Sequence, residues 1–327
     1  MELAGKNVLV TGGTGFIGSH LVKRLILEKA NIVVPYQSLN TKSYFYSEGL
    51  NKQVILAQKD LKNFKRTIDI VTKYEIEFIF HLAAQSIVPT AYHNPLETFE
   101  TNIMGTANVL EAARLYGKVQ GIIVVSSDKA YGKIPKANEN DALSGDHPYE
   151  TSKAACDLVA TTYFATYGLP VAVVRFGNVY GEGDINFSRI IPGALRSIIK
   201  NESLLIRSNG KYVRDYVYVG DVIEALILLS KNITKVKGEV FNISSNENLS
   251  VLEIVENVGE ILGKKINYRI QKNAINEIPR QSISFNKLKK RFGWKPKNNL
   301  KKTIPSIFNW YKNYFKDNSR HVDLGVK

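Results

Sequence analysis

The stretch TGGTGFIGSH, residues 11–20, directly follows the apolar run NVLV (7–10). Within it, Gly13, Gly15 and Gly18 form a G-x-G-x-x-G pattern between a predicted strand and a predicted helix, which is the context that a dinucleotide-binding turn requires. Glycines permit a tight turn, and they let backbone N–H groups approach a pyrophosphate that faces the N-terminus of the helix. The stretch therefore predicts a dinucleotide bound at the first strand–helix turn.

Outward from this turn, short runs rich in Val, Ile and Phe alternate with segments of helical length through the first 250 residues. The alternation predicts an α/β fold of the Rossmann type, a doubly wound, mostly parallel sheet with helices on both faces. The runs are NVLV (7–10), NIVVPY (31–36), QVILAQ (53–58), FIFHLAA (78–84), GIIVVSS (121–127), PVAVVRF (170–176) and GEVFNIS (238–244). Helices are expected over 15–29, 61–74, 95–117, 149–167 and 220–230.

The character of the chain changes after about residue 181, where loops lengthen and the pieces become smaller and more basic. Ser250 and Glu253 predict a capping box that starts a helix reaching about Leu262, and a further helix is expected over about 303–315. We therefore expect a first lobe over 1–180 that also receives about 212–244. A smaller α/β substrate lobe would cover 181–317, and 318–327 would be a frayed tail.

The composition restricts the class of protein. The chain has 327 residues, 44% of them hydrophobic, and its single cysteine, Cys156, cannot form an intramolecular disulfide. No apolar run approaches the roughly 18 residues of a membrane span, and the first residues do not resemble a signal peptide. We expect a cytoplasmic globular protein with no membrane partner.

The charge is strongly positive and unevenly placed. The net charge is +14, and residues 260–327 carry 17 Lys and Arg against 4 Asp and Glu, which indicates an anionic partner. The lysines are scattered, as in KLKKRFGWKPKNNLKK (287–302), without a recognised nucleic-acid-binding motif. We favour a solvated lysine-rich surface, part of whose charge serves a small anionic substrate, over a nucleic-acid partner.

The second predicted strand bears on the choice of cofactor. An NAD site usually has an acidic residue at the end of this strand, but VVPYQSLNTK (33–42) offers Tyr36 near that position and no acid. Lys42 is a candidate ligand for the 2′-phosphate of NADP. We favour NAD as the cofactor and leave NADP open.

Tyr149 and Lys153 lie four residues apart at the start of a predicted helix and so share one face. An ammonium near the phenol lowers its pKa, so that the tyrosine can exchange a proton with a sugar hydroxyl near neutral pH. This spacing is common in helices and is most often structural. Combined with the glycine turn and a serine at the end of another strand, it indicates a catalytic pair.

Seven motifs in order make the chain resemble the extended short-chain dehydrogenases/reductases. They are TGGTGFIGSH (11–20), HLAAQ (81–85), TNIMGTANVLEAA (101–113), SSDKAYG (126–132), PYETSK (148–153), RFGNVYGEGD (175–184) and RDYVYVGDV (214–222). More closely, the chain is similar to the sugar-nucleotide 4,6-dehydratases and 4-epimerases, above all to CDP-glucose 4,6-dehydratase-like enzymes. The resemblance runs from Asn7 to about Tyr314.

The resemblance implies the roles of most candidate site residues. Ser127 would bond the sugar O4 beside Tyr149, and Arg214 would bind the diphosphate, for which a guanidinium is well shaped. The implied cofactor site comprises Gly12, Gly15, Phe16, Ile17, Gly18, Asp60, Leu61, Leu82, Ala83, Ala84, Asn102, Tyr149 and Lys153. The implied substrate site comprises Gln85, Ser86, Asn178, Arg189, Arg214 and Arg280, and surface ion pairs remain the alternative for Arg214 and Arg280.

Asp128 and Lys129 follow Ser127 at the carboxyl end of a predicted strand, where open α/β sheets bind ligands. A 4,6-dehydratase removes the C5 proton and expels the C6 hydroxyl as water, so it needs a general base and a general acid on one side of the sugar. Enzymes of the CDP-glucose and UDP-N-acetylglucosamine types resemble this chain in having Asp-Lys here, which implies Asp128 as acid and Lys129 as base. The alternative is a salt-bridged turn on the surface.

We therefore expect a sugar-nucleotide 4,6-dehydratase, a lyase that moves hydride internally from C4 to C6 and yields a 4-keto-6-deoxy sugar. A 4-epimerase on a similar substrate is the alternative, and a non-catalytic protein that binds a cofactor or nucleic acid is an alternative of another class. The five histidines show no metal-binding spacing, and no His and acid partner for Ser127 is recognisable. By resemblance, the helices over 95–117 and 149–167 imply a homodimer.

Overall fold

The computed structural model describes residues 2–272 and 278–320, and a seven-stranded parallel sheet forms its centre. The strand order β11-β7-β5-β4-β1-β2-β3 contains the 3-2-1-4-5 order of a Rossmann fold. The strands are β1 (Asn7–Thr11), β2 (Asn31–Tyr36), β3 (Ile55–Gln58), β4 (Phe78–His81), β5 (Gly121–Val125), β7 (Val171–Phe176) and β11 (Val240–Ile243). Each of the seven predicted runs forms one of them, which confirms the expected fold class.

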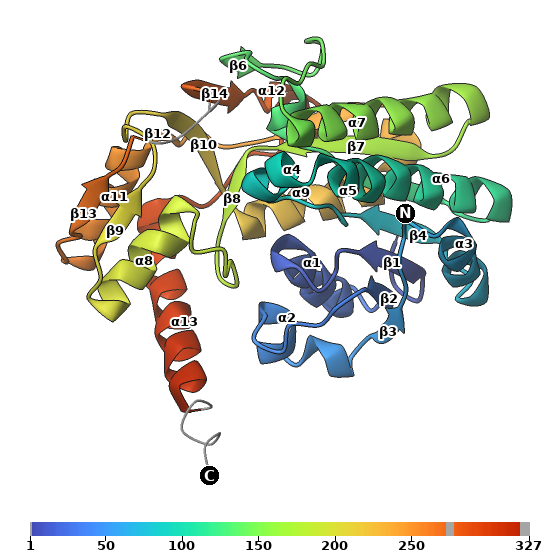
Figure 1. Cartoon of the computed structure of the whole chain (residues 1–327). Helices are drawn as coiled ribbons and strands as arrows, with labels where there is room; N and C mark the ends of the chain where they lie inside the picture. The colour runs from blue at the N-terminus through green and yellow to red at the C-terminus, as the bar shows by residue number, and fades with distance from the viewer. Residues whose placement is uncertain (1, 273–277, 321–327) are drawn as a thin grey trace.

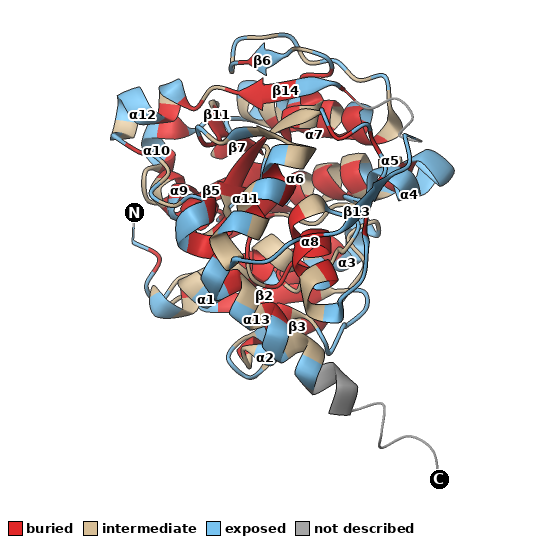
Figure 2. Ribbon diagram, turned by 90° about the vertical axis from the view of Figure 1, so that its left-hand side faces the viewer, coloured by how far each residue is buried: buried red, intermediate tan, exposed pale blue. Residues whose placement is uncertain are grey.

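Helices cover both faces of this sheet (Figure 1). Val8 and Val10 pack in one core with α1 (Phe16–Leu27) and α9 (Val219–Lys231), whereas Leu9 packs in a second core on the opposite face. The second core is closed by α3 (Phe64–Lys73), α6 (Gly105–Tyr116) and α7 (Pro148–Tyr167). Because both faces are buried, β5 is a continuous apolar run and β7 is apolar except for Arg175, and Figure 2 shows them in the buried colour.

The helix expected over 95–117 is interrupted. It is divided into α5 (Pro95–Phe99), a π-helical segment over Glu100–Met104, and α6. At this segment the carbonyl of Asn102 accepts hydrogen bonds from Thr106 Oγ1 at 2.6 Å and from Cys156 Sγ at 3.0 Å. Side chains from α6 and α7 thus satisfy a carbonyl where the regular helical ladder is broken, as is common in π segments near functional sites.

A second lobe contains most of the remaining strands. Its main sheet has the order β12-β10-β14-β6, with β8 also paired to β10, and a separate ribbon pairs β13 with β9. The strands are β6 (Lys136–Ala137), β8 (Asn178–Tyr180), β9 (Leu204–Ile206), β10 (Val213–Tyr218), β12 (Asn248–Ser250), β13 (Tyr268–Ile270) and β14 (Arg280–Ile283). The strand β10 pairs in this sheet, whereas α9 and β11 pack on the first sheet. The segment 212–244 is therefore divided between the two sheets. The domain boundaries stay a prediction.

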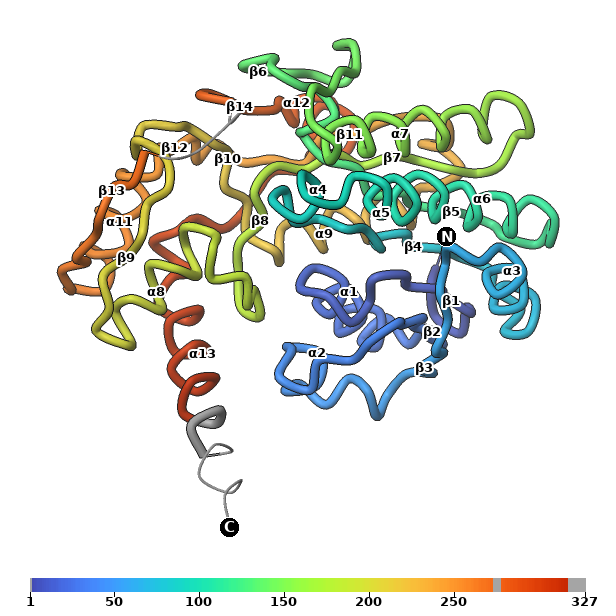
Figure 3. The backbone as a smooth tube through the Cα atoms, viewed as in Figure 1, coloured from blue at the N-terminus to red at the C-terminus, as the bar shows by residue number. Residues whose placement is uncertain are grey.

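Three longer helices belong to the second lobe: α8 (Ile190–Lys200), α11 (Val251–Leu262) and α13 (Leu300–Arg320). The predicted capping box of Ser250 and Glu253 is confirmed at the start of α11. The last helix extends five residues beyond its expected end at 315, because no Gly or Pro interrupts 316–320, so the start of the predicted frayed tail is helical. Figure 3 shows α13 leaving the second lobe at the red end of the chain, and the residues 321–327 of that tail lie outside the described residues.

The shorter helical elements connect these parts. They are α2 (Tyr44–Ser47), α4 (Val88–His93), α10 (Ile233–Val236), α12 (Asn286–Phe292), and the 3₁₀ turns η1 (Leu50–Lys52) and η3 (Asp128–Ala130). Among the helices of the described residues, none combines the length and the apolar character needed to cross a membrane. The turn η3 lies directly after β5, at the edge of the sheet where the two lobes meet.

Candidate active site

A cavity of about 1030 Å³ opens where the carboxyl ends of the parallel strands face the second lobe. This volume is at the top of the range of about 300–1,000 Å³ for single small-molecule sites, so the cavity has room for more than one ligand. It brings together nineteen of the predicted site residues: Gly12, Gly15, Phe16, Ile17, Gly18, Asp60, Leu61, Leu82, Ala83, Ala84, Ser86, Ser127, Asp128, Lys129, Tyr149, Lys153, Asn178, Arg189 and Arg214.

The glycine turn is built without room for side chains. Gly12 has φ +70°, and a Cβ on it would lie 2.8 Å from the backbone nitrogen of Ala83. A Cβ on Gly18 would lie 2.1 Å from the carbonyl oxygen of Gly12. Gly13 instead makes room for the side chain of Val34 on β2, so Gly12 rather than Gly13 opens the turn to the cavity. With α1 beginning directly after Gly15, the turn fits the pyrophosphate of a dinucleotide.

An amide after β2, Gln37, and a carboxylate after β3, Asp60, lie together at the cavity. Asp60 Oδ1 accepts from Gln37 Nε2 at 2.7 Å and from the backbone nitrogen of Lys62 at 2.9 Å. The predicted phosphate ligand Lys42 is not among the residues that line the cavity, because it lies on an exposed loop beyond the strand. Lys59, which does line it, is paired with Asp69 at 2.8 Å.

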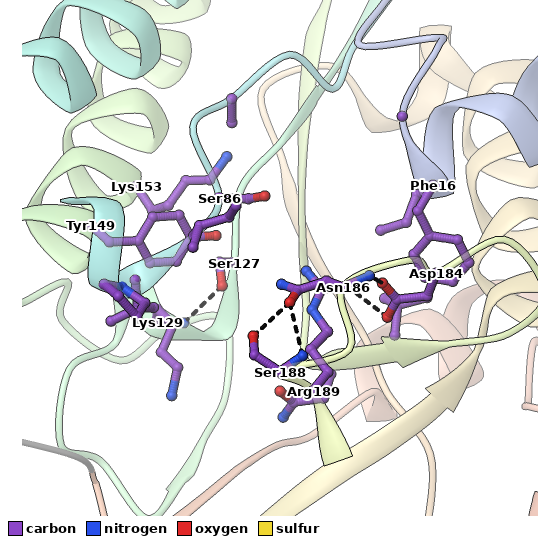
Figure 4. Close-up of a pocket in the computed structure, with 18 of the residues that line it drawn as sticks. Phe16, Ser86, Ser127, Lys129, Tyr149, Lys153, Asp184, Asn186, Ser188 and Arg189 are labelled. Carbon is purple, nitrogen blue, oxygen red and sulfur yellow. Dashed lines mark hydrogen bonds and ion pairs between the residues drawn. The ribbon is translucent and has the colours of Figure 1, made fainter. Parts of the chain in front are cut away.

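Tyr149, Lys153 and Ser127 converge at the base of the cavity, as Figure 4 shows. All three are buried, and the Tyr149 phenol forms a side-chain hydrogen bond with Ser127. Lys153 Nζ donates to the carbonyl of Val125 at 3.0 Å, which fixes the lysine under the last residue of β5. The predicted pair therefore shares one helix face and meets the predicted serine.

The electrostatics of this group differ from the expectation. Burial raises the pKa of Tyr149 to about 12, although the hydrogen bond with Ser127 and the charge of Arg189 oppose the rise. Burial also lowers the pKa of Lys153, whose amine is bound to a backbone carbonyl. The phenol's pKa is therefore raised, where proximity to Lys153 was expected to lower it, because loss of water around the phenol outweighs the nearby positive charges.

The acid and the amine share one 3₁₀ turn. Ser127 caps η3 by accepting from the backbone nitrogen of Lys129 at 3.2 Å, and its hydroxyl donates to Asp128 Oδ1 at 2.9 Å. Asp128 is only 5% exposed, which rules out the alternative of a solvated surface turn. Figure 4 shows the side chain of Lys129 running away from Tyr149 and Lys153 along the cavity wall.

The second lobe contributes polar side chains to the opposite wall. Arg189 Nη1 donates to the buried Asp184 Oδ2 at 3.0 Å, and Asn186 and Ser188 lie beside them in Figure 4. Arg214 donates from Nη1 to the carbonyl of Val213 at 2.8 Å on β10. With Arg207, three arginines thus line one cavity, an arrangement suited to an anionic ligand.

Three predicted residues lie elsewhere. Asn102 is buried beneath the cavity, where its side chain bonds the backbone of Gln85 at 2.7 and 3.1 Å and Ser152 Oγ at 2.9 Å. The side chain of Gln85 turns back to the backbone of Ile87. Arg280 is exposed at the start of β14 and does not line the cavity. Asn102 therefore holds the backbone of Gln85, whose neighbours Ala84 and Ser86 line the cavity.

Three residues that the sequence reasoning missed stand next to predicted ones. His147 Nδ1 accepts from the backbone nitrogen of Tyr149 at 3.2 Å and caps α7, a role that its place before Pro148 could have suggested. Asp215 follows Arg214 and is buried near Asp128. Gln281, which follows Arg280, contacts η3, and no local sequence signal marks it.

Comparisons with known proteins match this geometry. Residues 9–307 match the family model described as GDP-mannose 4,6 dehydratase. The chain is 30% identical to a CDP-glucose 4,6-dehydratase of Salmonella typhimurium, with 94% of this chain and 91% of the relative covered. It is also 30% identical to a putative UDP-glucose 4-epimerase of Methanocaldococcus jannaschii, with 94% and 98% covered. A solved structure of dTDP-glucose 4,6-dehydratase from Bacillus anthracis in complex with NAD has a TM-score of 0.83 and 28% identity, and 94% of this chain and 97% of that chain are covered.

Proposed function

The chain belongs to the GDP-mannose 4,6 dehydratase family, among the extended short-chain dehydrogenases/reductases that act on nucleotide sugars, and within it we propose that the protein is a 4,6-dehydratase. The observation that carries the proposal is the turn η3, which places a buried carboxyl and an amine directly after the serine that meets Tyr149. A 4-epimerase needs the serine and the tyrosine but no further acid and base. A dehydratase needs all four groups.

The cofactor is NAD, held by the glycine turn and by the backbone at Leu82–Ala84. The NAD-bound relative supports this choice, and the walls of the turn are free of side chains that would exclude a pyrophosphate. When bound, NAD would supply the hydride chemistry, in which hydride from C4 of the sugar would be taken up and later returned at C6. The protein therefore needs no external reductant for the overall reaction.

The first step is oxidation at C4. Tyr149 takes the proton of the O4 hydroxyl while Ser127 orients that oxygen through its own hydroxyl, and the C4–O4 bond becomes a carbonyl. Lys153 lies beneath the site, where its bond to the Val125 carbonyl fixes its position. Asp157, one turn after Lys153, pairs with Arg175 at 2.7 Å and anchors α7 to β7.

The second step is elimination of water. The C4 carbonyl acidifies the neighbouring C5–H bond, so Lys129 takes the C5 proton while the C6–O6 bond breaks and Asp128 gives a proton to the departing oxygen. Lys129 then returns its proton to C5 as C6 becomes a methyl group. One water leaves, and the product is a nucleotide-linked 4-keto-6-deoxy sugar.

The substrate is a nucleoside-diphosphate hexose of the CDP-glucose or UDP-N-acetylglucosamine type. The Asp-Lys pair at 128–129 and the relative from Salmonella typhimurium support this choice. Arg214 and Arg189 line the cavity, where their guanidinium charge would match a diphosphate.

We also propose a homodimer. The apolar side chains of Leu96, Met104 and Leu158 are 66%, 53% and 58% exposed on the neighbouring elements α5, the π segment and α7. Apolar side chains grouped on adjoining helices are typical of an isologous interface between two copies.

The experiment that tests the function is incubation with NAD and one of CDP-glucose, UDP-N-acetylglucosamine, dTDP-glucose and GDP-mannose, followed by mass spectrometry. A product lighter by one water establishes dehydration and names the substrate. A product of unchanged mass with an inverted C4 favours the epimerase, for which the relative from Methanocaldococcus jannaschii is the supporting observation. Salt-sensitive retention on nucleic acid without turnover would support a non-catalytic protein.

A further inference from the structure

A buried amide from the second lobe reaches into the catalytic turn. Gln281 lies on β14 and is 1% exposed. Its Nε2 donates to the carbonyl of Asp128 at 3.1 Å and to the carbonyl of Gly132 at 3.4 Å. Its Oε1 accepts a hydrogen bond from Lys129 Nζ. One side chain thus spans η3 and contacts the amine that the proposed reaction uses as its base.

The orientation of this amide is fixed by its partners. An amide nitrogen only donates and an amide oxygen only accepts, and the two backbone carbonyls at Asp128 and Gly132 can only accept. A flipped Gln281 would set its oxygen against both carbonyls and its nitrogen against the Lys129 amine. The two carbonyls therefore force Oε1 to face Lys129, and burial leaves no water to replace a lost bond.

The bond constrains what the amine can do. When Oε1 accepts one N–H of a neutral amine, the lone pair of Nζ points away from Gln281 and toward another side of the amine. After the amine takes a proton, the same N–H···O bond persists and becomes charge-assisted. Gln281 can therefore hold Lys129 in one place through both halves of a proton transfer.

We propose that Gln281 is a positioning residue for Lys129, which aligns the amine with the C5–H bond of the sugar. The inference rests on the proposed function, in which Lys129 takes and returns the C5 proton. No atom is transferred to Gln281, because the proton moves from C5 to Nζ and later back to C5. On β14, Gln281 pairs in register with Arg214 of β10, which lines the cavity. The second lobe therefore supplies both the proposed diphosphate ligand Arg214 and the hydrogen-bond partner of Lys129.

A structural role for Gln281 makes a different prediction, and the neighbouring Ser282 provides a matched control. Ser282 is 5% exposed on the same strand, and its hydroxyl donates to the carbonyl of Pro135 at 3.0 Å. Together with the Ser282 backbone nitrogen, which donates to the same carbonyl, the hydroxyl joins β14 to the segment after η3 and does not bond the Lys129 amine. Loss of a strand-to-turn bond alone should affect the Ser282→Ala and Gln281→Leu variants alike.

The test compares Gln281→Leu, Gln281→Glu and Ser282→Ala with the wild-type enzyme, on the sugar nucleotide that it dehydrates. Gln281→Leu should lower kcat for water loss by about tenfold to a hundredfold, as expected when a reacting group is misplaced by about 1 Å. C4 oxidation, followed by the absorbance of reduced nicotinamide, should remain, and exchange of the C5 proton with deuterated water should slow. Ser282→Ala should keep the wild-type exchange rate.

The Gln281→Glu variant adds a pH signature. A carboxylate beside an amine favours its protonated form, and the base must be neutral to take a proton. The loss of activity at low pH should therefore extend to higher pH in Gln281→Glu than in the wild type. If Gln281 has only a structural role, the pH at which activity is lost should be the same in the variant and the wild type.

The outcomes separate the inference from the function. If the wild type dehydrates none of the four sugar nucleotides, the proposed function and the inference fail together. If the wild type is active and Lys129→Met abolishes water loss while Gln281→Leu keeps the wild-type rate, only the inference fails. If Gln281→Leu lowers activity further in the Lys129→Met background, as measured by C4 oxidation, the residue does not act through Lys129 and the inference also fails.

Discussion

Asp215 and Asp128, which come from different lobes, meet at Gly177. A Cβ on Gly177 would lie 3.3 Å from Cβ of Asp215, which is a tight contact, and 3.9 Å from Oδ2 of Asp128, which is an ordinary van der Waals contact. Asp215 Oδ2 accepts from Ser244 Oγ at 2.6 Å and from the backbone nitrogen of Ile283 at 2.7 Å. Its other oxygen, Oδ1, is buried and has no hydrogen-bond partner within the described part of the chain.

Asp215 should make folding stability depend on pH. Burial, together with the charge of Asp128, raises the pKa of Asp215 from 3.8 to about 6, although Ser244, Ile283 and Lys136 oppose the rise. Because the folded state binds this proton more tightly, the contribution is fully present below about pH 4 and is lost as the pH rises through about 6. The loss amounts to about 3 kcal/mol of unfolding free energy.

The Asp215→Asn variant should lack this loss, since an amide oxygen can still accept from Ser244 and Ile283. Denaturant unfolding at a series of pH values should show the variant gaining stability relative to the wild type between pH 4 and 7. Asp69→Asn is the control, because its exposed partner Lys59 lowers the pKa of Asp69 and the effect should be small and of opposite sign. A difference between Asp215→Asn and wild type that does not change with pH would contradict this account.

Protonation of His147 at acid pH should weaken the cap at the start of α7, where Tyr149 lies. The ring accepts from the Tyr149 N–H through Nδ1, which requires a neutral ring with its proton on Nε2. Burial lowers the pKa of His147, so its contribution is present above 6.5 and is lost as the pH falls through the lower folded value. His147→Ala should lose about 1 kcal/mol of stability at neutral pH, whereas His147→Asn should keep the cap.

Thermal unfolding of both variants at two pH values checks this prediction. His147→Asn should stay stable at a pH where the wild type has begun to weaken, because an asparagine cap does not titrate near neutral pH. Equal stability of the alanine and asparagine variants would show that the ring makes no useful cap. Their turnover at neutral pH should follow the same order.

The glycine turn should be intolerant of a methyl group. Gly18→Ala would place a Cβ 2.1 Å from the Gly12 carbonyl oxygen, and backbone cannot move aside as a flexible side chain can. We expect NAD to bind at least about tenfold more weakly, which is about 1.4 kcal/mol. Gly105→Ala is the control, because its nearest atom would be 4.0 Å away and an alanine in a helix is favourable by about 0.5–1 kcal/mol. Calorimetric titration with NAD distinguishes the two variants.

The proposed dimer should depend on apolar helix faces. Met104→Glu and Leu158→Glu place a charge on side chains that are 53% and 58% exposed, and burial of that charge between two copies is costly. Light scattering should show a monomer for these variants and a dimer for the wild type. Leu27→Glu, on a side chain 74% exposed in α1, should remain dimeric. A wild-type monomer at micromolar concentration would remove the proposal.

The fold was predictable because its signal is local. A parallel sheet buried on both faces favours strands rich in β-branched residues. GIIVVSS and PVAVVRF therefore predict β5 and β7 without knowledge of their neighbours. The turn η3 was predictable in the same way, since Ser127, Asp128 and Lys129 are consecutive. The π segment at 100–104 was not, because the carbonyl of Asn102 there depends in part on Cys156, which lies 54 positions away.

The partners of the site were less predictable, because they depend on contacts between distant positions. Gln281 stands 152 positions from Lys129, and nothing in the composition of QSI (281–283) differs from an ordinary strand. Asn102 was expected to line the cofactor site by resemblance, but the structure places it one layer below, bound to Gln85. The raised pKa of Tyr149 also depends on how many neighbours exclude water, which residue spacing cannot give.

Tyr149→Phe and Lys129→Met should stop the reaction at different steps. Tyr149→Phe removes the group that takes the O4 proton, so oxidation at C4 should fall by about 10²–10⁴-fold and no reduced nicotinamide should appear. Lys129→Met leaves Ser127 and Tyr149 in place, so reduced nicotinamide should accumulate while no water is lost. Absorbance of the cofactor and mass spectrometry of the sugar nucleotide, recorded on the same samples, separate the two steps.

Lys133→Met is the matched control for the lysine, because Lys133 is 74% exposed in the same segment and pairs with Asp146 on the surface. It should dehydrate the substrate at the wild-type rate, since a surface ion pair contributes little. Full activity in Lys129→Met would remove that lysine from the mechanism and leave C5 proton abstraction to another group. If Tyr149→Phe still produced reduced nicotinamide at the wild-type rate, the phenol would not be the base at O4.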